Sequence, residues 1–244
     1  MNETFLTIIS TLATGAAICM FASPILTVLE MIKSRSIGVM TITFFCAMLM
    51  NCYVWSMYGV QTRAVPVIIC NTLGNVIASW SILNFLTIAR LEERSGHALK
   101  STTYAATFNT VRLTLGLAIV FLLVMISMYT TLGAGVTATV NGLAGGCCSV
   151  FMLSSPLMMA KDIIKNKNAE GLQPVTMTFA TANSLLWTLY GLLKSDPYIA
   201  VPNTLCSFAC FFQFFLLLRY GRKPSVAVVT IVESLAPVPL DGEA

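Results

Sequence analysis

Two asparagines stand out as candidates for substrate contact, because each lies in the middle of an otherwise apolar stretch. They are Asn71 and Asn203. An unpaired amide in hydrocarbon costs several kcal/mol, so each is expected to face a partner or a water-filled cavity. An amide offers two donors and an acceptor, which suits the neighbouring hydroxyl groups of a sugar. One such asparagine would be explained by a bond between helices; two at matched positions favour a binding site.

Two tryptophans strengthen this interpretation. Trp55 and Trp187 each precede one of the asparagines by 16 residues. An aromatic face can stack on the apolar C–H face of a pyranose while the indole N–H donates a hydrogen bond. The alternative is a tryptophan belt at the membrane interface, but both residues lie inside their stretches and not at the ends. Two further asparagines, Asn51 and Asn183, precede the tryptophans by four residues and so lie on the same helix faces as the tryptophans. They indicate a polar cavity.

Several kinds of chemistry are not expected. The carboxylates Glu30, Asp162 and Asp196 fall at the ends of apolar stretches, and the single histidine, His97, lies in a polar loop. Proton-coupled carriers generally need a titratable group inside the membrane, so downhill transport is favoured. With no nucleophile–base pair, phosphate loop or metal-type cluster in the sequence, neither an enzyme nor a cofactor is expected. Of the eight cysteines, nearly all lie inside predicted spans, and Cys147, Cys148, Cys206 and Cys210 are predicted to be small packing residues.

The elements that must position these residues are membrane-spanning helices. The chain of 244 residues is 57% hydrophobic and 10% charged, whereas soluble domains have about 25% charged residues. A span needs roughly 20 apolar residues, and its backbone must satisfy its own hydrogen bonds, which favours helices over strands. Seven stretches qualify: 5–30, 40–60, 65–89, 108–131, 135–160, 174–193 and 198–219.

The chain repeats itself at an offset of 132 residues, the separation of Ser23 and Ser155. Each copy covers three stretches, and the stretch 108–131 has no counterpart. An odd number of helices between the copies leaves both in the same orientation, and transport sites in such folds lie between the copies near the midplane. The matched pairs are Met20 and Met152, Pro24 and Pro156, Asn51 and Asn183, Trp55 and Trp187, Tyr58 and Tyr190, and Asn71 and Asn203.

The predicted fold is therefore an all-α membrane protein with seven transmembrane helices, arranged as two parallel three-helix bundles joined by a linker helix. Pro24 and Pro156 interrupt their helices at one register, which favours hinges over fixed kinks. The predicted domains are a first repeat at 1–95, a loop and linker helix at 96–133, a second repeat at 134–222 and a cytosolic tail at 223–244.

The basic residues predict the orientation. All but two of the 14 lysines and arginines fall on one side of the predicted bundle, and the exceptions are Arg63 and Lys194. The positive-inside rule then places the N-terminus outside and the C-terminus in the cytosol. This bias explains the net charge of +4 without any nucleic-acid partner. The plasma membrane is the expected location, and an internal membrane stays open.

With these motifs in place, the chain resembles the SWEET family of sugar transporters, within the PQ-loop superfamily. The similarity lies in both serine–proline pairs, in the run from Asn51 to Gly59, and in the run from Trp187 through Asp196-Pro197 to Asn203. The resemblance implies a facilitative, bidirectional carrier for mono- or disaccharides that works by alternating access. It also implies a homo-oligomer.

The resemblance further implies roles for individual residues. Asn71 and Asn203 match the sugar-binding asparagines, and the two tryptophans match the stacking pair. Met20, Asn51, Met152 and Asn183 match positions linked to sugar size, where large side chains favour a hexose such as glucose over sucrose. The residues that resemble the extracellular gate are Tyr58, Tyr190 and Asp196.

One departure from the family pattern concerns the hinge. Family members carry a proline near the start of the second helix, but Thr41-Ile42-Thr43 has none, while Pro174 serves the sixth helix. The hinge of the first copy is therefore incomplete.

Two other functions stay open. An amino-acid carrier of the PQ-loop type would show a Pro-Gln pair, where this chain has Pro24-Ile25 and Pro156-Leu157. A seven-helix receptor would explain the spans and the outside N-terminus, but not the repeat.

Overall fold

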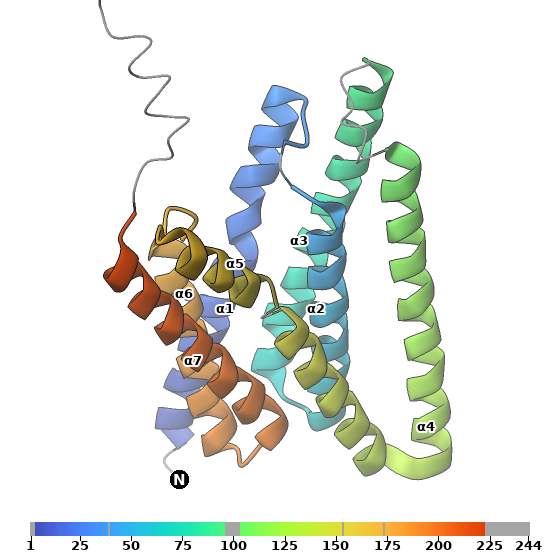
Figure 1. Ribbon diagram of the computed structural model, residues 1–244. Helices are drawn as coiled ribbons and strands as arrows, with labels where there is room; N and C mark the ends of the chain where they lie inside the picture. The colour runs from blue at the N-terminus through green and yellow to red at the C-terminus, as the bar shows by residue number, and fades with distance from the viewer. Residues whose placement is uncertain (1–2, 39, 96–102, 153, 173, 223–244) are drawn as a thin grey trace, which may run out of the picture.

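The computed structural model describes residues 3–38, 40–95, 103–152, 154–172 and 174–222, without the side chains of 154–158. Within these ranges every regular element is a helix, and no strand occurs (Figure 1). The helices are α1 (Glu3–Ser34), α2 (Ile42–Thr62), α3 (Val65–Arg94), α4 (Tyr104–Met152), α5 (Ser154–Asn166), α6 (Pro174–Leu193) and α7 (Pro197–Tyr220).

The helices match the predicted spans except around α4. Five described helices, α1, α2, α3, α4 and α7, are long and apolar enough to cross a membrane. The 49-residue α4 turns at Gly133, where φ is 83° and ψ is 171°, a conformation that glycine adopts at little cost. The predicted fourth span and most of the fifth therefore belong to one helical element, and the fifth span ends in α5. The all-helical, seven-span fold is confirmed.

The helices of the two copies pack in the same order, and the first two helices of one copy contact those of the other. In the first copy α3 lies between α1 and α2, and in the second copy α7 contacts α6 on one side and α4 and α5 on the other. Between the copies, α1 contacts α6, and α2 contacts the second part of α4 (Figure 1). The first part of α4 lies against the first copy, with Val111 in its apolar cluster and Phe121 against Tyr53.

The backbone repeats as well as the sequence. Among the described residues, four that are not glycine have a positive φ: Arg35, Arg63, Lys167 and Ser195. They form two pairs at the 132-residue offset, with φ of 54° and 50° in the first pair and 55° and 54° in the second. Each follows the C-terminal end of a helix. The two copies therefore end corresponding helices in the same way.

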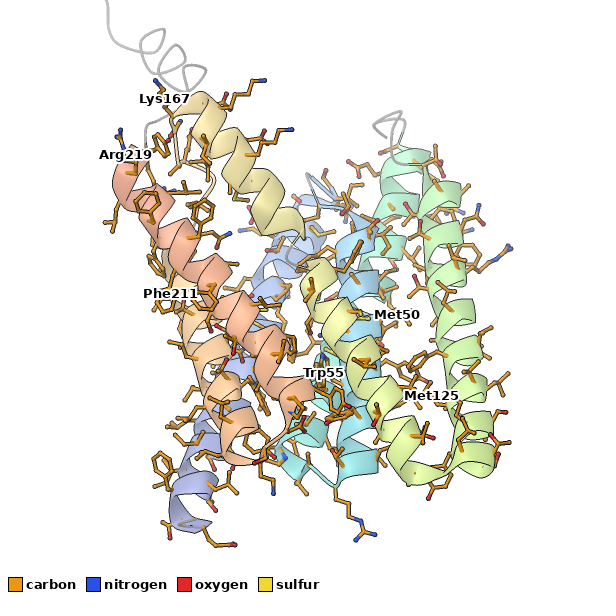
Figure 2. All side chains as sticks on the ribbon, turned by 60° about the horizontal axis from the view of Figure 1, so that its bottom comes forward. Met50, Trp55, Met125, Lys167, Phe211 and Arg219 are labelled. Atoms are coloured by element: carbon orange, nitrogen blue, oxygen red, sulfur yellow. The ribbon has the colours of Figure 1, made fainter. Side chains whose placement is uncertain are left out.

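The surface is apolar around the outside of the bundle. Leu26, Leu83, Phe208 and Leu218 are 74%, 66%, 67% and 85% exposed. Large apolar faces of this kind mark contact with lipid or a partner. Most of the basic residues instead lie at one end of the bundle, as Lys167 and Arg219 show in Figure 2. We call this the basic end, defined by the residues Lys33, Arg35, Arg90, Arg94, Lys165, Lys167, Arg219 and Arg222.

Three predicted hinge prolines have different settings. Pro24 is buried inside α1, where it removes a backbone hydrogen bond. Pro156 lies in α5 among the residues whose side chains are outside the description. Pro174 is the first residue of α6, where its missing N–H interrupts no helical bond. A further proline that the sequence interpretation passed over, Pro202, lies inside α7 next to Asn203.

Close approach of α6 and α7 depends on Gly191. A Cβ at this position would lie 2.6 Å from the backbone nitrogen of Ala200 and 2.9 Å from its Cα. Its matched glycine, Gly59, approaches Ile68 in the same way. Backbone atoms cannot yield as a flexible side chain can, so a methyl group here must push the two helices apart.

We expect Gly191→Ala to destabilise the protein by about 1–3 kcal/mol, the usual cost of overpacking. The detergent-purified variant should melt at a lower temperature than the wild type. Gly15→Ala is the matched control, because a Cβ at Gly15 meets nothing within 4 Å. Equal melting temperatures for the two variants would contradict the close-packing argument.

Candidate functional site

A cavity of about 500 Å³ lies between the two copies and reaches side chains from α1 through α7. This volume is within the roughly 300–1,000 Å³ of small-molecule sites. The lining includes all eight residues that the sequence predicts as substrate-binding: Met20, Asn51, Trp55, Asn71, Met152, Asn183, Trp187 and Asn203. The structure thus brings the matched residues of both copies to one place. Their contact with a substrate stays a prediction.

The two central asparagines are held by the same bond. Asn71 Nδ2 donates to the carbonyl oxygen of Val67 at 2.9 Å, and Asn203 Nδ2 donates to that of Ile199 at 2.8 Å. Each bond reaches back one helical turn and fixes the amide on its own helix. No described residue donates to either amide oxygen. Both oxygens are therefore available as acceptors for a hydroxyl group in the cavity.

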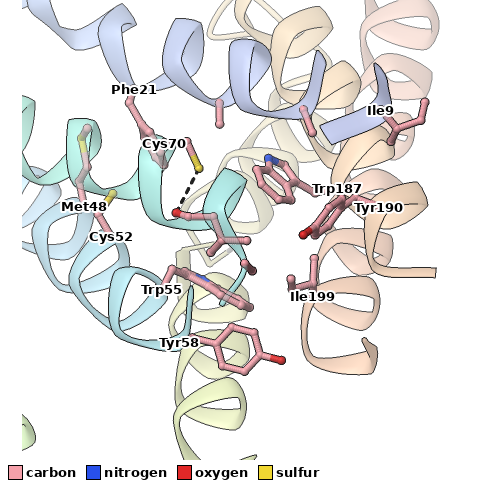
Figure 3. Packing of buried hydrophobic residues seen from close by; sticks show 14 of the residues in the cluster. Ile9, Phe21, Met48, Cys52, Trp55, Tyr58, Cys70, Trp187, Tyr190 and Ile199 are labelled. Carbon is pink, nitrogen blue, oxygen red and sulfur yellow. Dashed lines mark hydrogen bonds between the residues drawn. The ribbon is translucent and has the colours of Figure 1, made fainter. Parts of the chain in front are cut away.

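The two tryptophans have similar packing but different hydrogen bonds. Each lies edge-to-face against the tyrosine three residues later, with ring centroids 5.5 Å apart for Trp55 and Tyr58 and 5.3 Å for Trp187 and Tyr190 (Figure 3). Trp55 Nε1 donates to Ser149 Oγ at 3.1 Å. Trp187 has no hydrogen-bond partner in the described part of the chain. Of the two indole N–H groups, that of Trp187 is therefore the one free to donate to a substrate.

Ser149 is a site residue that the sequence interpretation missed. Its hydroxyl accepts from Trp55 and donates to Asn51 Oδ1 at 3.3 Å, which ties two predicted substrate-binding residues to the second copy. The matched position in the first copy is Ala17, which also lines the cavity. A comparison of matched positions finds only residues that agree, so a serine paired with an alanine gave no signal.

Asn183 carries an unsatisfied acceptor in the cavity wall. Its side chain is 8% exposed, and its Oδ1 is buried with no hydrogen-bond partner. Buried polar atoms are nearly always paired with protein or water. This oxygen therefore has unused hydrogen-bonding capacity next to the cavity.

A hydrogen bond between the copies closes one end of the cavity. Tyr58 Oη donates to Asp196 Oδ2 at 2.7 Å, while Asp196 Oδ1 accepts from the backbone nitrogens of Tyr198 and Ile199 and so caps α7. We call this region the sealed end, defined by Tyr58, Asp196, Tyr198 and Gly142. Gly142 allows the closure, because a Cβ there would lie 2.7 Å from Tyr198 and 2.8 Å from Tyr58.

The predicted gate is one-sided. Tyr190, the match of Tyr58, has no hydrogen bond among the described residues and packs in the central apolar cluster. The residue at the offset of Asp196 is Ala64, which belongs to the same cluster and can accept no side-chain bond. The structure therefore brings Tyr58 and Asp196 together and packs Tyr190 in the central apolar cluster; the role of these three residues as a gate stays a prediction.

A second polar contact lies near the sealed end and was also missed from the sequence. Asn141 is fully buried, and its Nδ2 donates to Gln61 Oε1 at 3.0 Å, while its Oδ1 has no partner. The matched residues, Ile9 and Leu193, are apolar and meet in the central cluster. The same interface is thus polar on one side of the bundle and apolar on the other.

The cavity continues toward the basic end through the second copy. Its lining there includes Met159, Leu172, Thr176 and Gln213. No charged side chain lines the cavity among the residues that the structure describes. The arrangement is a neutral, partly polar chamber that is closed at the sealed end.

Comparisons with known proteins define the class. A family model described as "Sugar efflux transporter for intercellular exchange" matches residues 7–93 and again 139–225. The chain therefore belongs to the SWEET family of transporters and is an integral membrane protein, not an enzyme.

Particular relatives agree with this. The chain is 26% identical to "Sugar transporter SWEET1" of Dictyostelium discoideum, over 90% of this chain and 95% of that protein. It is 30% identical to "Bidirectional sugar transporter SWEET7" of Arabidopsis thaliana, over 84% and 75% of the two chains. A solved eukaryotic SWEET transporter shares the fold with a TM-score of 0.75 and 20% identity, covering 88% of this chain and 96% of that one.

We expect Tyr58→Phe to loosen the sealed end, because it removes the side-chain bond that joins Tyr58 of α2 to Asp196 at the start of α7. Amide hydrogens of residues 198–201 should exchange with solvent faster in the variant, by several-fold. Tyr190→Phe is the matched control, since the Tyr190 hydroxyl makes no bond in the described structure. Identical exchange in the two variants would contradict the role of this bond.

Proposed function

We propose that this protein is a facilitative, bidirectional sugar transporter. One observation carries the proposal: the matched asparagines and tryptophans of both copies line a single cavity at the interface between them. Amide oxygens that lack donors suit the hydroxyl groups of a sugar, and indole rings suit its C–H faces. The relatives named as sugar transporters support the same substrate class.

Alternating access is the mechanism that this geometry supports. The two copies, with α4 as linker, act as the moving units and rock about the crosswise contacts of α1 with α6 and α2 with α4. By the positive-inside rule the basic end faces the cytosol and the N-terminus lies outside. The structure then corresponds to a state closed toward the outside, held by Tyr58 and Asp196.

The substrate we propose is a hexose such as glucose. Met20 and Met152 contribute two long side chains to the cavity from opposite copies, and Asn51 and Asn183 occupy the other positions linked to sugar size. Smaller residues there would leave room for a second sugar ring. We further propose that the protein lies in the plasma membrane and forms a homo-oligomer.

An amino-acid carrier is the second candidate, and the cavity disfavours it. A zwitterionic substrate needs partners for both its ammonium and its carboxylate group, because an unpaired charge away from water is costly. The described lining offers neither an acidic nor a basic side chain. A receptor is disfavoured by the family and by the internal repeat.

We expect Asn203→Ala and Asn71→Ala each to reduce glucose uptake to about a tenth of the wild-type rate or below, because each removes hydrogen bonds to the substrate. The measurement is uptake of radiolabelled hexoses and sucrose in cells that lack their own hexose carriers. Asn84→Ala is the matched control: Asn84 makes the same backward bond on α3, at 2.8 Å to Trp80, but lies outside the cavity.

The tryptophans provide a parallel comparison. Trp187→Ala should reduce glucose uptake to a similar extent. Trp80→Ala should not, because the third tryptophan of the chain lies outside the cavity. Surface expression is measured for every variant. Normal glucose flux in an Asn203→Ala variant at normal surface level would reject the proposed site.

We expect uptake to be indifferent to a proton gradient, because no carboxylate or histidine lines the described cavity. Reconstituted vesicles should equilibrate glucose to the same final level with and without an imposed pH gradient. Accumulation above the external concentration, abolished by an uncoupler, would show coupling and overturn the uniport mechanism.

A further inference from the structure

A second pocket lies outside the substrate cavity, between the end of α3 and the start of α4 at the basic end. Its volume is about 350 Å³, and it shares no lining residue with the cavity. Leu83, Leu86, Arg90 and Arg94 line it from one face of α3, at helical spacing, and Tyr104 lines it from α4. The pocket is apolar along Leu83 and Leu86 and cationic where α3 ends.

The two arginines of the pocket have no acidic partner in the described structure. The Arg90 guanidinium lies 5.7 Å from the centre of the Tyr104 ring, and neither it nor Arg94 forms an ion pair there. The nearby carboxylates accept from neutral donors instead. Glu92 accepts from Ser36 Oγ at 2.8 Å and from the Ile37 nitrogen at 3.2 Å, and Glu93 accepts from the Tyr104 nitrogen at 3.3 Å.

The apolar part of the pocket faces the bilayer. Leu83 is 66% exposed and Leu91 is 48% exposed. Seven residues separate Leu83 from Arg90, which corresponds to about 10 Å of helix at 1.5 Å per residue. Apolar side chains and guanidinium groups without an acidic partner therefore lie along one stripe of α3. In a bilayer, this stripe would cross the boundary between the acyl chains and the headgroups.

This combination matches one kind of ligand. Guanidinium groups bind phosphate oxygens in a planar, two-bond geometry. Basic pockets between transmembrane helices on the cytoplasmic side are suited to anionic headgroups. We propose that this pocket binds an anionic phospholipid, with Arg90 and Arg94 on the headgroup phosphate and one acyl chain along Leu83 and Leu86.

The pocket occurs in the first copy because the first part of α4 forms one of its walls. Arg222 matches Arg90 at the repeat offset, and Arg219 lies over Tyr220 at 5.4 Å, so the end of α7 has a similar pair of cations. Among the described residues, however, no helix after α7 corresponds to the first part of α4, and Leu218 is 85% exposed. A bound lipid would thus join the linker helix to the first copy only.

Native mass spectrometry of the detergent-purified full chain tests the proposal, with phosphatidylserine, phosphatidylcholine and inorganic phosphate as separate probes. We expect one retained phosphatidylserine per chain. Its apparent affinity should fall by about tenfold in Arg90→Gln/Arg94→Gln. Arg219→Gln/Arg222→Gln is the matched control: it removes two charges from the same end and should leave binding unchanged.

Three outcomes would overturn the proposal: equal loss in both double variants, equal binding of phosphatidylcholine, or inorganic phosphate displacing the lipid at equal concentration. A pocket-filling variant, Leu86→Trp, keeps both charges and should also weaken binding of phosphatidylserine. If the Arg90→Gln/Arg94→Gln protein fails to fold, undiminished binding to Leu86→Trp rejects the site by itself.

Discussion

A polar side chain inside a membrane-spanning bundle must find a hydrogen bond or face a cavity, and this constraint organises the centre of the protein. Lipid offers no compensation for an unpaired amide or indole N–H. Asn71 and Asn203 meet the requirement by donating back to their own helices. Trp55 meets it through Ser149. The amide oxygens of Asn71, Asn203 and Asn183 and the indole N–H of Trp187 have no partner among the described residues, and these four residues line one chamber, which suits a polar molecule.

The repeat supplies the pairs of residues, but the hydrogen bonds break its symmetry. At two matched positions that form contacts between the copies, one copy has a polar residue and the other an apolar one: Ser149 against Ala17, and Asp196 against Ala64. The bond between Asn141 and Gln61 likewise corresponds to apolar packing of Ile9 and Leu193. The two halves share a backbone, including its left-handed helix ends, yet the contacts that close the bundle run from α2 to the second copy. Separating α2 from the second copy would therefore cost a different free energy from separating α1 from α6.

The sequence alone predicted the fold and the membership of the cavity because both depend on matched positions. The eight predicted substrate-binding residues line one chamber, as the repeat register implied. Residues without a match gave no such signal, and this is why Ser149, Asn141 and Gln61 were missed. The joining of the fourth and fifth spans into α4 depends on one backbone conformation at Gly133, which apolar periodicity does not encode. Pro174, predicted as a hinge residue, is the first residue of α6 and interrupts no helical bond, and its role as a hinge stays a prediction.

The strength of the closure suits a carrier that must reopen. The sealed end is held by a neutral tyrosine donating to a carboxylate and by one amide–amide bond, with no ion pair joining these residues in the described structure. Hydrogen bonds contribute about 0.5–1.5 kcal/mol each, or about 1.5–3 kcal/mol where one partner is charged. Their sum is a few kcal/mol, which lies within the range of differences between interconverting states. The unpaired oxygen of Asn141 lowers the net gain further, because opening would let water reach it. An interface of fully paired charges would stabilise one state more strongly. An interface that leaves a hydrogen-bond acceptor unpaired is therefore consistent with exchange between two states.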